Sequence, residues 1–216
     1  MLHGPRRWIK INLSPPPRIR VVPTRRIVGR SMSIHRELAP SRRALPGSSA
    51  AVEIPWRTGD EMQSRRIAQF GTSEYDYKND VAVLCSGPPI PSYLKEKLLD
   101  GVNHANGGEE YTQCVINLYR AENDIPWHVD HPHFGENVLV YTFGEARPLL
   151  FRLKVRPRAI YRACPRHGSK YTLSGSARYD WEHSVPPGKG FRASITFRTW
   201  TGPPTKPKTS GLGTEE

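Results

Sequence analysis

The chain has 216 residues, of which 37% are hydrophobic and 24% charged, and its formal net charge at pH 7 is +12. This length suits one domain of ordinary size with flanking tails. No run of about 18 apolar residues occurs, so the sequence predicts no transmembrane helix. Three cysteines show no spacing typical of a disulfide framework, so we expect free thiols with packing roles in a reducing compartment at Cys85, Cys114 and Cys164.

Residues 1–59 hold most of the positive charge. They carry twelve Lys or Arg against two acidic residues, which leaves a net charge of +2 for residues 60–216. They are also rich in Pro, which removes backbone donors and clashes inside a helix, so we expect this segment to be mostly disordered. Such a basic arm suits contact with nucleic acid, an anionic membrane or an import receptor.

Two interpretations of this arm stay open. In the first it is the solvated basic tail of an intracellular protein, in the cytoplasm or the nucleus or both. In the second it is an Arg-rich transit peptide that directs the chain to the mitochondrion. The absence of acidic residues before Glu37 favours a transit peptide, whereas the prolines weaken the amphipathic helix that such a peptide needs.

The pattern of a folded domain extends from residue 60 to about residue 200. Residues 65–77 predict a short strand and a turn, with aromatic side chains. Residues 89–102 predict a helix, because apolar residues recur there at helical spacing. This stripe consists of Leu94, Leu98, Leu99 and Val102.

Short β-branched and aromatic stretches follow, separated by Gly and Pro turns, and they predict five strands. They are residues 112–119, 137–144, 148–155, 169–175 and 191–200. Together with the helix they predict an α+β fold, mainly β, with a sandwich or barrel-like core. Residues 201–216 lack the apolar residues to fold and are expected to form a disordered tail.

Three histidines and an aspartate gather in the stretch "IPWHVDHPHFG", residues 125–135. His128 and Asp130 are two apart, so on an extended segment both side chains point to the same side. A third ligand is needed from elsewhere, and we expect His183. Two histidines and one carboxylate leave coordination positions open, as in non-haem Fe(II) oxygenases. A lone H-x-D is more often an ordinary loop sequence, and we interpret the rival ligands His131 and His133 as loop or pocket-rim residues.

Two arginines mark the last predicted strand. Four side chains share one of its faces, namely Arg192, Ser194, Thr196 and Arg198. Two arginines on an inward face are costly unless an anion meets them. The spacing suits a small dicarboxylate with one guanidinium near each end. The alternative is an edge strand with solvated arginines.

These motifs together resemble the AlkB-like family of Fe(II)/2-oxoglutarate dioxygenases. The family pattern is H-x-D, a distal His and R-x-x-x-x-x-R, found here at 128–130, 183 and 192–198, with N-x-Y upstream at 117–119. The resemblance covers roughly residues 60–200. It implies a double-stranded β-helix (jelly-roll) core with a supporting N-terminal helix, and it implies Fe(II), the cosubstrate 2-oxoglutarate and O₂.

The resemblance also implies roles for individual residues. His128, Asp130 and His183 would bind Fe(II), and Arg192 would pair with the C5 carboxylate of 2-oxoglutarate with help from Tyr119. Support for the other end of the cosubstrate or for the metal ligands would come from Asn117, Ser194 and Arg198. Arg178 matches an arginine that family members often carry before the distal His, and its alternative role is a structural ion pair.

Oxidative demethylation or hydroxylation of methylated bases is the activity that the resemblance implies. The basic arm can attract phosphate, and aromatic side chains can stack on an extracted base, with Phe70, Tyr75 and Tyr77 as candidates. The small net charge of residues 60–216 favours RNA or single-stranded DNA over duplex. The alternatives are an oxygenase of the same class that acts on protein side chains, or a non-catalytic RNA-binding module. We expect no membrane partner and a monomer.

Overall fold

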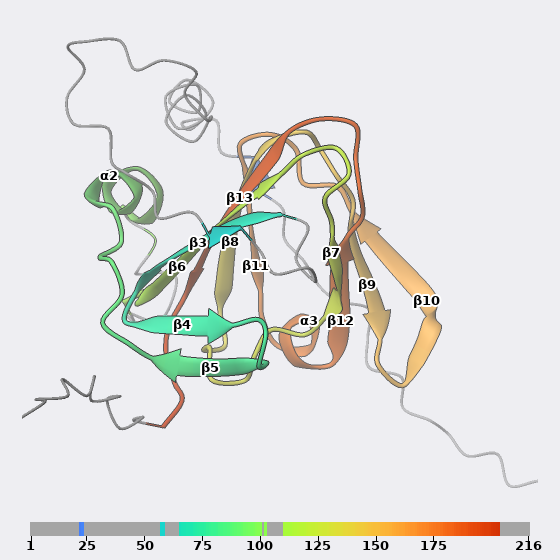
Figure 1. Ribbon diagram of the computed structural model, residues 1–216. Coiled ribbons are helices and arrows are strands. Elements are labelled where there is room, and N and C mark those ends of the chain that lie inside the picture. Colours follow the sequence, from blue (N-terminus) through green and yellow to red (C-terminus); the bar gives the residue numbers. More distant parts are fainter. Residues whose placement is uncertain (1–21, 24–56, 59–64, 101, 103–109, 204–216) are drawn as a thin grey trace, which may run out of the picture.

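The computed structural model describes residues 22–23, 57–58, 65–100, 102 and 110–203, which form two large antiparallel β-sheets, a two-stranded hairpin and short helical segments (Figure 1). The expectations for the basic arm and for the C-terminal tail lie almost wholly outside these residues. The larger sheet consists of β1 (Val22–Pro23), β11 (Ser169–Leu173), β8 (Val138–Gly144), β13 (Arg192–Arg198), β6 (Gln113–Tyr119), β3 (Arg66–Gly71) and β2 (Arg57–Thr58), in that order.

The smaller sheet lies opposite the larger one, and a separate hairpin stands beside the two (Figure 1). In spatial order the smaller sheet consists of β10 (Arg156–Ala163), β9 (Leu149–Leu153), β12 (Trp181–Val185) and β7 (Ile125–His128), and the hairpin of β4 (Ser73–Asp76) and β5 (Val81–Leu84). From β6 to β13 the chain passes repeatedly between the two sheets, with β10 as the exception. This winding is that of a jelly roll, so the expected α+β, mainly β class is confirmed.

Strand β13 shows how the sheets are packed. Its odd-numbered residues, Ala193, Ile195 and Phe197, are fully buried against the helical segment, while its even-numbered residues face the smaller sheet. The larger sheet is therefore covered on both faces. A second apolar cluster, with Phe151 and Trp181 among its members, joins the two sheets.

The expected helix at 89–102 is confirmed in part. Helical residues are confined to α2 (Ser92–Leu94) and the π-helical turn η1 (Lys95–Leu99), and the helix ends where Asp100 turns to ψ 121°. Leu94, Leu98 and Leu99 are buried, as their spacing predicted, and Val102 packs against the same cluster. Among the helices that the structure describes, none has the length and apolar character needed to cross a bilayer.

Several strands were not predicted. They are β5, β7 and β12, which are short, and β10, which has eight residues. β7, β10 and β12 contain Pro or charged residues, so their local pattern is weak. Residues 65–77 form two strands rather than one, because the chain turns at Gly71, whose φ of 104° favours glycine. The three cysteines are free thiols, as expected. Only Cys114 is buried, and the packing role expected for Cys164 is wrong because that side chain is exposed.

Candidate metal centre

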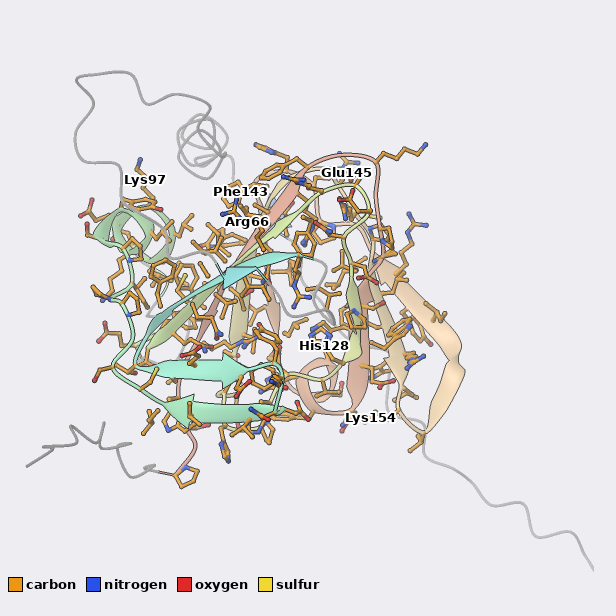
Figure 2. All side chains as sticks on the ribbon, viewed as in Figure 1. Arg66, Lys97, His128, Phe143, Glu145 and Lys154 are labelled. Atoms are coloured by element: carbon orange, nitrogen blue, oxygen red, sulfur yellow. The ribbon has the colours of Figure 1, made fainter. Side chains whose placement is uncertain are left out.

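A cavity of about 550 Å³ lies between the two sheets. Its walls come from β6, β8, β11 and β13 on one side and from β7, β9 and β12 on the other, and the hairpin β4–β5 contributes to its mouth. His128 stands between the sheets in Figure 2. The cavity receives all four side chains that were expected to share one face of the last strand, Arg192, Ser194, Thr196 and Arg198. The alternative of a solvated edge strand is wrong, since β13 is central in its sheet.

The three expected metal ligands meet in this cavity. His128 ends β7 and lies directly opposite His183 of the neighbouring strand β12, with ring centroids 4.2 Å apart. Asp130 follows in the next loop. One ligand atom from each of the three residues lies within 4.8 Å of the others. Two imidazoles and a carboxylate at this separation can hold a divalent metal and leave positions open.

The protonation states also fit a metal. Burial lowers the pKa of His128. Burial, and after it the repulsion from a protonated His128, lowers the pKa of His183 to about 3. Both rings are therefore neutral at pH 7. The pKa of Asp130 falls below its usual range, because Arg198 and the two histidines outweigh the effect of burial. His128 donates from Nδ1 to the carbonyl of Pro126 at 2.8 Å, which leaves Nε2 for the metal.

Arg198 forms a hydrogen bond with one of the candidate metal ligands, Asp130. Its Nη2 donates a short hydrogen bond to Oδ1 of Asp130, and its guanidinium lies 4.8 Å from the centre of the Phe134 ring. This contact does not test the expectation that Arg198 also approaches one end of a dicarboxylate, because its Nε is buried without a partner among the described residues and the side chain lines the cavity. Its alternative role, support of the metal ligands, agrees with the contact.

Arg192 has the opposite character. It is 2% exposed, its Nη1 has no hydrogen-bond partner within the described residues, and its guanidinium lies 4.8 Å from the centre of the Tyr119 ring. A buried guanidinium without an anion is costly, so this end of the cavity is built for a carboxylate. Tyr119 and Ser194 lie beside it, with their hydroxyl oxygens 3.4 Å apart.

Comparison with known proteins decides the family. The family model of the 2OG-Fe(II) oxygenase superfamily matches residues 33–198. This chain belongs to that superfamily. The protein is a 2-oxoglutarate- and Fe(II)-dependent dioxygenase, and its cofactor and cosubstrates are Fe(II), 2-oxoglutarate and O₂.

Two relatives of this dioxygenase show how far the likeness extends. An uncharacterized protein of Acanthamoeba polyphaga mimivirus, L905, is 26% identical over 143 residues, which is 57% of this chain and 67% of the viral protein. The solved structure of the plant AlkB homologue OsALKBH1 superimposes with a TM-score of 0.57 at 14% identity, over 87% of this chain and 99% of that one. The second match agrees with the jelly-roll fold.

The mouth of the dioxygenase cavity is aromatic. Tyr75 of β4 and Tyr77, which follows it, meet edge to face with ring centroids 4.8 Å apart, and Tyr75 lies 6.0 Å from the ring of His131. The hydroxyl of Tyr75 donates to the carboxylate of Asp80. Phe70 does not belong here: it is 3% exposed and packs in the core, so its expected role in stacking is wrong.

Asn117 makes a contact that the sequence did not indicate. Its side-chain oxygen accepts a hydrogen bond of 2.9 Å from Nε of Arg65, a buried arginine just before β3. The Arg65 guanidinium in turn lies 5.7 Å from the centre of the Tyr77 ring. No local pattern marks Arg65, because its role depends on the pairing of β3 with β6.

The remaining expected residues separate into two groups. His131 lines the cavity, as a rim residue should, whereas the ring of His133 packs 5.3 Å from the Trp200 ring and is absent from the cavity lining. Arg178 donates to backbone carbonyls, and within the described residues it forms no ion pair with a carboxylate, so the alternative of a structural ion pair has no support there.

Proposed function

We propose that this dioxygenase is AlkB-like and oxidises methylated bases of RNA or single-stranded DNA. One observation carries the proposal. A single cavity holds the candidate metal ligands and Arg192, whose Nη1 has no partner among the described residues, in its interior and an aromatic pair, Tyr75 and Tyr77, at its mouth. The motifs of the sequence and the likeness to the fold of an AlkB homologue support it.

In this proposal His128, Asp130 and His183 hold Fe(II), and Arg192 binds the C5 carboxylate of 2-oxoglutarate. Loaded Fe(II) supplies the activation of O₂, by which 2-oxoglutarate is oxidised to succinate and CO₂ while one oxygen atom enters a C–H bond of the substrate. Where that bond belongs to an N-methyl group, the hydroxymethyl product releases formaldehyde and leaves the N–H base.

The chain itself positions and shields the reactants. Arg198 keeps Asp130 ionised, and the hydrogen bond from His128 to the Pro126 carbonyl orients that ring. Apolar side chains line the cavity next to the ligands and exclude water from the reacting bond. They are Val138, Val140, Leu149, Leu173 and Val185.

Charge near the smaller sheet supports a nucleic-acid substrate. Residues 152–170 contain seven Lys or Arg and no acidic residue. Positive charge is therefore concentrated in this segment, although the net charge of residues 60–216 as a whole is small. Three of these side chains, Lys154, Arg162 and Arg166, are exposed. Clustered cations of this kind attract phosphate independently of base sequence.

The second candidate is an N-methylated protein side chain. Two tyrosine rings next to the carboxylate of Asp80 at the cavity mouth also suit a methylammonium group, which aromatic faces and a negative charge attract. This reading keeps the same oxygenase chemistry and changes only the substrate.

A substrate panel separates the two candidates. Purified wild type, supplied with Fe(II), 2-oxoglutarate and O₂, is incubated with methylated RNA, methylated single-stranded DNA or methylated peptides, with His128→Ala as control. We expect formaldehyde and succinate with a nucleic acid and neither product with the variant. Formaldehyde from peptides alone would replace the nucleic-acid proposal by the second candidate.

Arg192→Met is expected to raise the KM for 2-oxoglutarate by about 10- to 100-fold, because a buried charge-assisted hydrogen bond contributes about 1.5–3 kcal/mol. Succinate formation at varied 2-oxoglutarate measures the effect. Arg166→Met, which removes the same charge from an exposed site, serves as control and should leave this KM unchanged. An unaltered KM in Arg192→Met would show that the carboxylate binds elsewhere.

Tyr77→Ala is expected to lower kcat/KM for the methylated nucleic acid about 10-fold, because base stacking on an aromatic ring contributes about 1–3 kcal/mol. Tyr77→Phe keeps the ring and should retain the wild-type value. Succinate formed without the nucleic acid monitors the metal centre and should not change in either variant. An equal loss of kcat/KM in both variants would show that the Tyr77 hydroxyl contributes to substrate binding and that ring stacking does not.

A further inference from the structure

Arg178 lies close to the candidate metal centre without lining the cavity. It belongs to α3 (Ser176–Tyr179), the short helix just before β12, the strand that carries His183. The side chain is large and charged, yet it is 2% exposed. Burial of a charged group is costly unless its donors are satisfied, so the position calls for a specific role.

Three backbone carbonyls converge on this guanidinium. Nη1 donates to the carbonyl of Asp130 at 2.8 Å, and Nη2 donates to the carbonyls of His131 and Phe134, each at 2.7 Å. All three acceptors belong to the loop that starts at the candidate ligand Asp130. Arg178 has no ion pair with a carboxylate among the described residues, and its Nε is buried there without a partner, so the hydrogen bonds of its guanidinium all go to the backbone of this loop.

The loop is held from its other side as well. Arg198 donates to the carboxylate of Asp130 and covers the ring of Phe134, which is fully buried and packs 6.0 Å from the Trp200 ring. Arg198 thus binds the Asp130 side chain, whereas Arg178 binds the backbone that carries it. Without Arg178 the carboxylate would keep one anchor and lose the fixed direction of its Cα–Cβ bond.

We propose that Arg178 is a positioning residue of the metal centre, which holds the 130–134 loop so that the Asp130 carboxylate faces His128 and His183 before the metal arrives. One guanidinium thereby joins the two chain segments that supply the ligands, since the loop provides Asp130 and the strand after α3 provides His183. The same contacts explain why an arginine is needed: lysine cannot span three carbonyls with a planar fork.

Metal affinity without turnover tests the proposal. Mn(II) is titrated into wild type, Arg178→Ala, Arg178→Lys and the control Arg152→Met. The control removes an equal charge from β9, where Arg152 pairs with Glu182, lies over the Trp127 ring and, within the described residues, forms no hydrogen bond or ion pair with the 130–134 loop. We expect the Mn(II) dissociation constant to rise about 10- to 100-fold in both Arg178 variants, the usual effect of removing groups that orient metal ligands, and to stay unchanged in the control.

Two further readouts separate positioning from general stability. Free guanidinium, at a low and non-denaturing concentration, should restore part of the Mn(II) affinity of Arg178→Ala and should not affect Arg178→Lys, whose side chain still fills the site. With saturating metal, the variants should recover most of kcat, and their KM for 2-oxoglutarate should match the wild type. If Arg178→Ala does not fold, Arg178→Lys decides.

A folded Arg178→Lys with lower thermal stability and wild-type Mn(II) affinity would overturn the proposal and leave a structural role. The inference rests on the assignment of the three ligands and not on the nucleic-acid substrate, so His183→Ala is titrated beside it. If His183→Ala bound Mn(II) as tightly as wild type, the ligand assignment itself would fail.

Discussion

Asp130→Ala is expected to abolish metal binding and turnover together. The residue supplies the only carboxylate of the candidate cluster, and its pKa lies below the usual range, so it is ionised at any pH at which the enzyme works. Groups that merely orient ligands contribute 10- to 100-fold in metal affinity, so removal of a ligand should lower Mn(II) affinity by more than about 100-fold. Mn(II) titration and succinate formation at saturating 2-oxoglutarate measure the two effects.

A second consequence concerns stability. The Asp130–Arg198 pair is largely buried, with side-chain exposures of 5% and 12%, and removal of one partner leaves the other charge without an anion. Breaking such a pair costs about 3–5 kcal/mol, so the variant should unfold at lower denaturant concentration. His133→Ala, three residues further along the chain and outside the cluster, is the control for metal binding. Wild-type Mn(II) affinity in a folded Asp130→Ala would remove this residue from the site.

Arg147→Met is expected to lower the free energy of unfolding by about 3–5 kcal/mol without loss of metal affinity, because several acceptors lose their donor and each buried acceptor left unsatisfied costs about 1–3 kcal/mol. The residue belongs to the connection between β8 and β9, and its side chain is 1% exposed. It donates to the Glu145 carboxylate at 2.9 Å and to the carbonyls of Asn123, Arg120 and Gly190 at 2.5–2.7 Å. The substitution leaves one carboxylate and three carbonyls without this donor.

Thermal and chemical denaturation measure this loss, and a change of that size corresponds to a drop in Tm of roughly 10 °C for a chain of this length. Arg152→Met is the matched control, because its partner Glu182 is a partly exposed carboxylate and a pair of that kind contributes about 1 kcal/mol or less. An equal loss in the two variants would mean that the four contacts of Arg147 contribute no more than the ion pair and the Trp127 ring contact of Arg152.

Local spacing predicted much of the site, because a strand places alternate residues on one face. The face that Arg192 shares with Arg198 follows from this rule. The same spacing predicted that His128 and Asp130 act together, but Asp130 follows β7 in a loop, so the loop and not a strand places its carboxylate at the site. The apolar stripe of the helix at 89–102 was also predicted from the sequence, because only the 3.6-residue period of a helix is needed to identify it. These predictions agree with the cavity lining and with the buried leucines.

The strands that resisted prediction share a physical cause. β7 contains Pro126, and β12 reads "WEHSV", in which a buried histidine and a partly exposed glutamate interrupt the apolar pattern. Such strands are stable because neighbours in the sheet complete their hydrogen bonds, not because of their own propensity. The two strands that bring His128 opposite His183 were therefore among those missed, although the residues themselves were identified.

The sequence by itself determined the period-two faces, the set of side chains able to bind a divalent metal and a dicarboxylate, and the mainly β class. Only the tertiary structure decided which arginine does what. Arg192 and Arg198 are equivalent in local pattern, but Arg192 lies over the Tyr119 ring, with no hydrogen-bond partner for its Nη1 among the described residues, whereas Arg198 forms an ion pair with Asp130. Such roles arise from contacts between strands distant in the chain, where burial and a neighbouring charge set the function of a side chain that local spacing leaves undetermined.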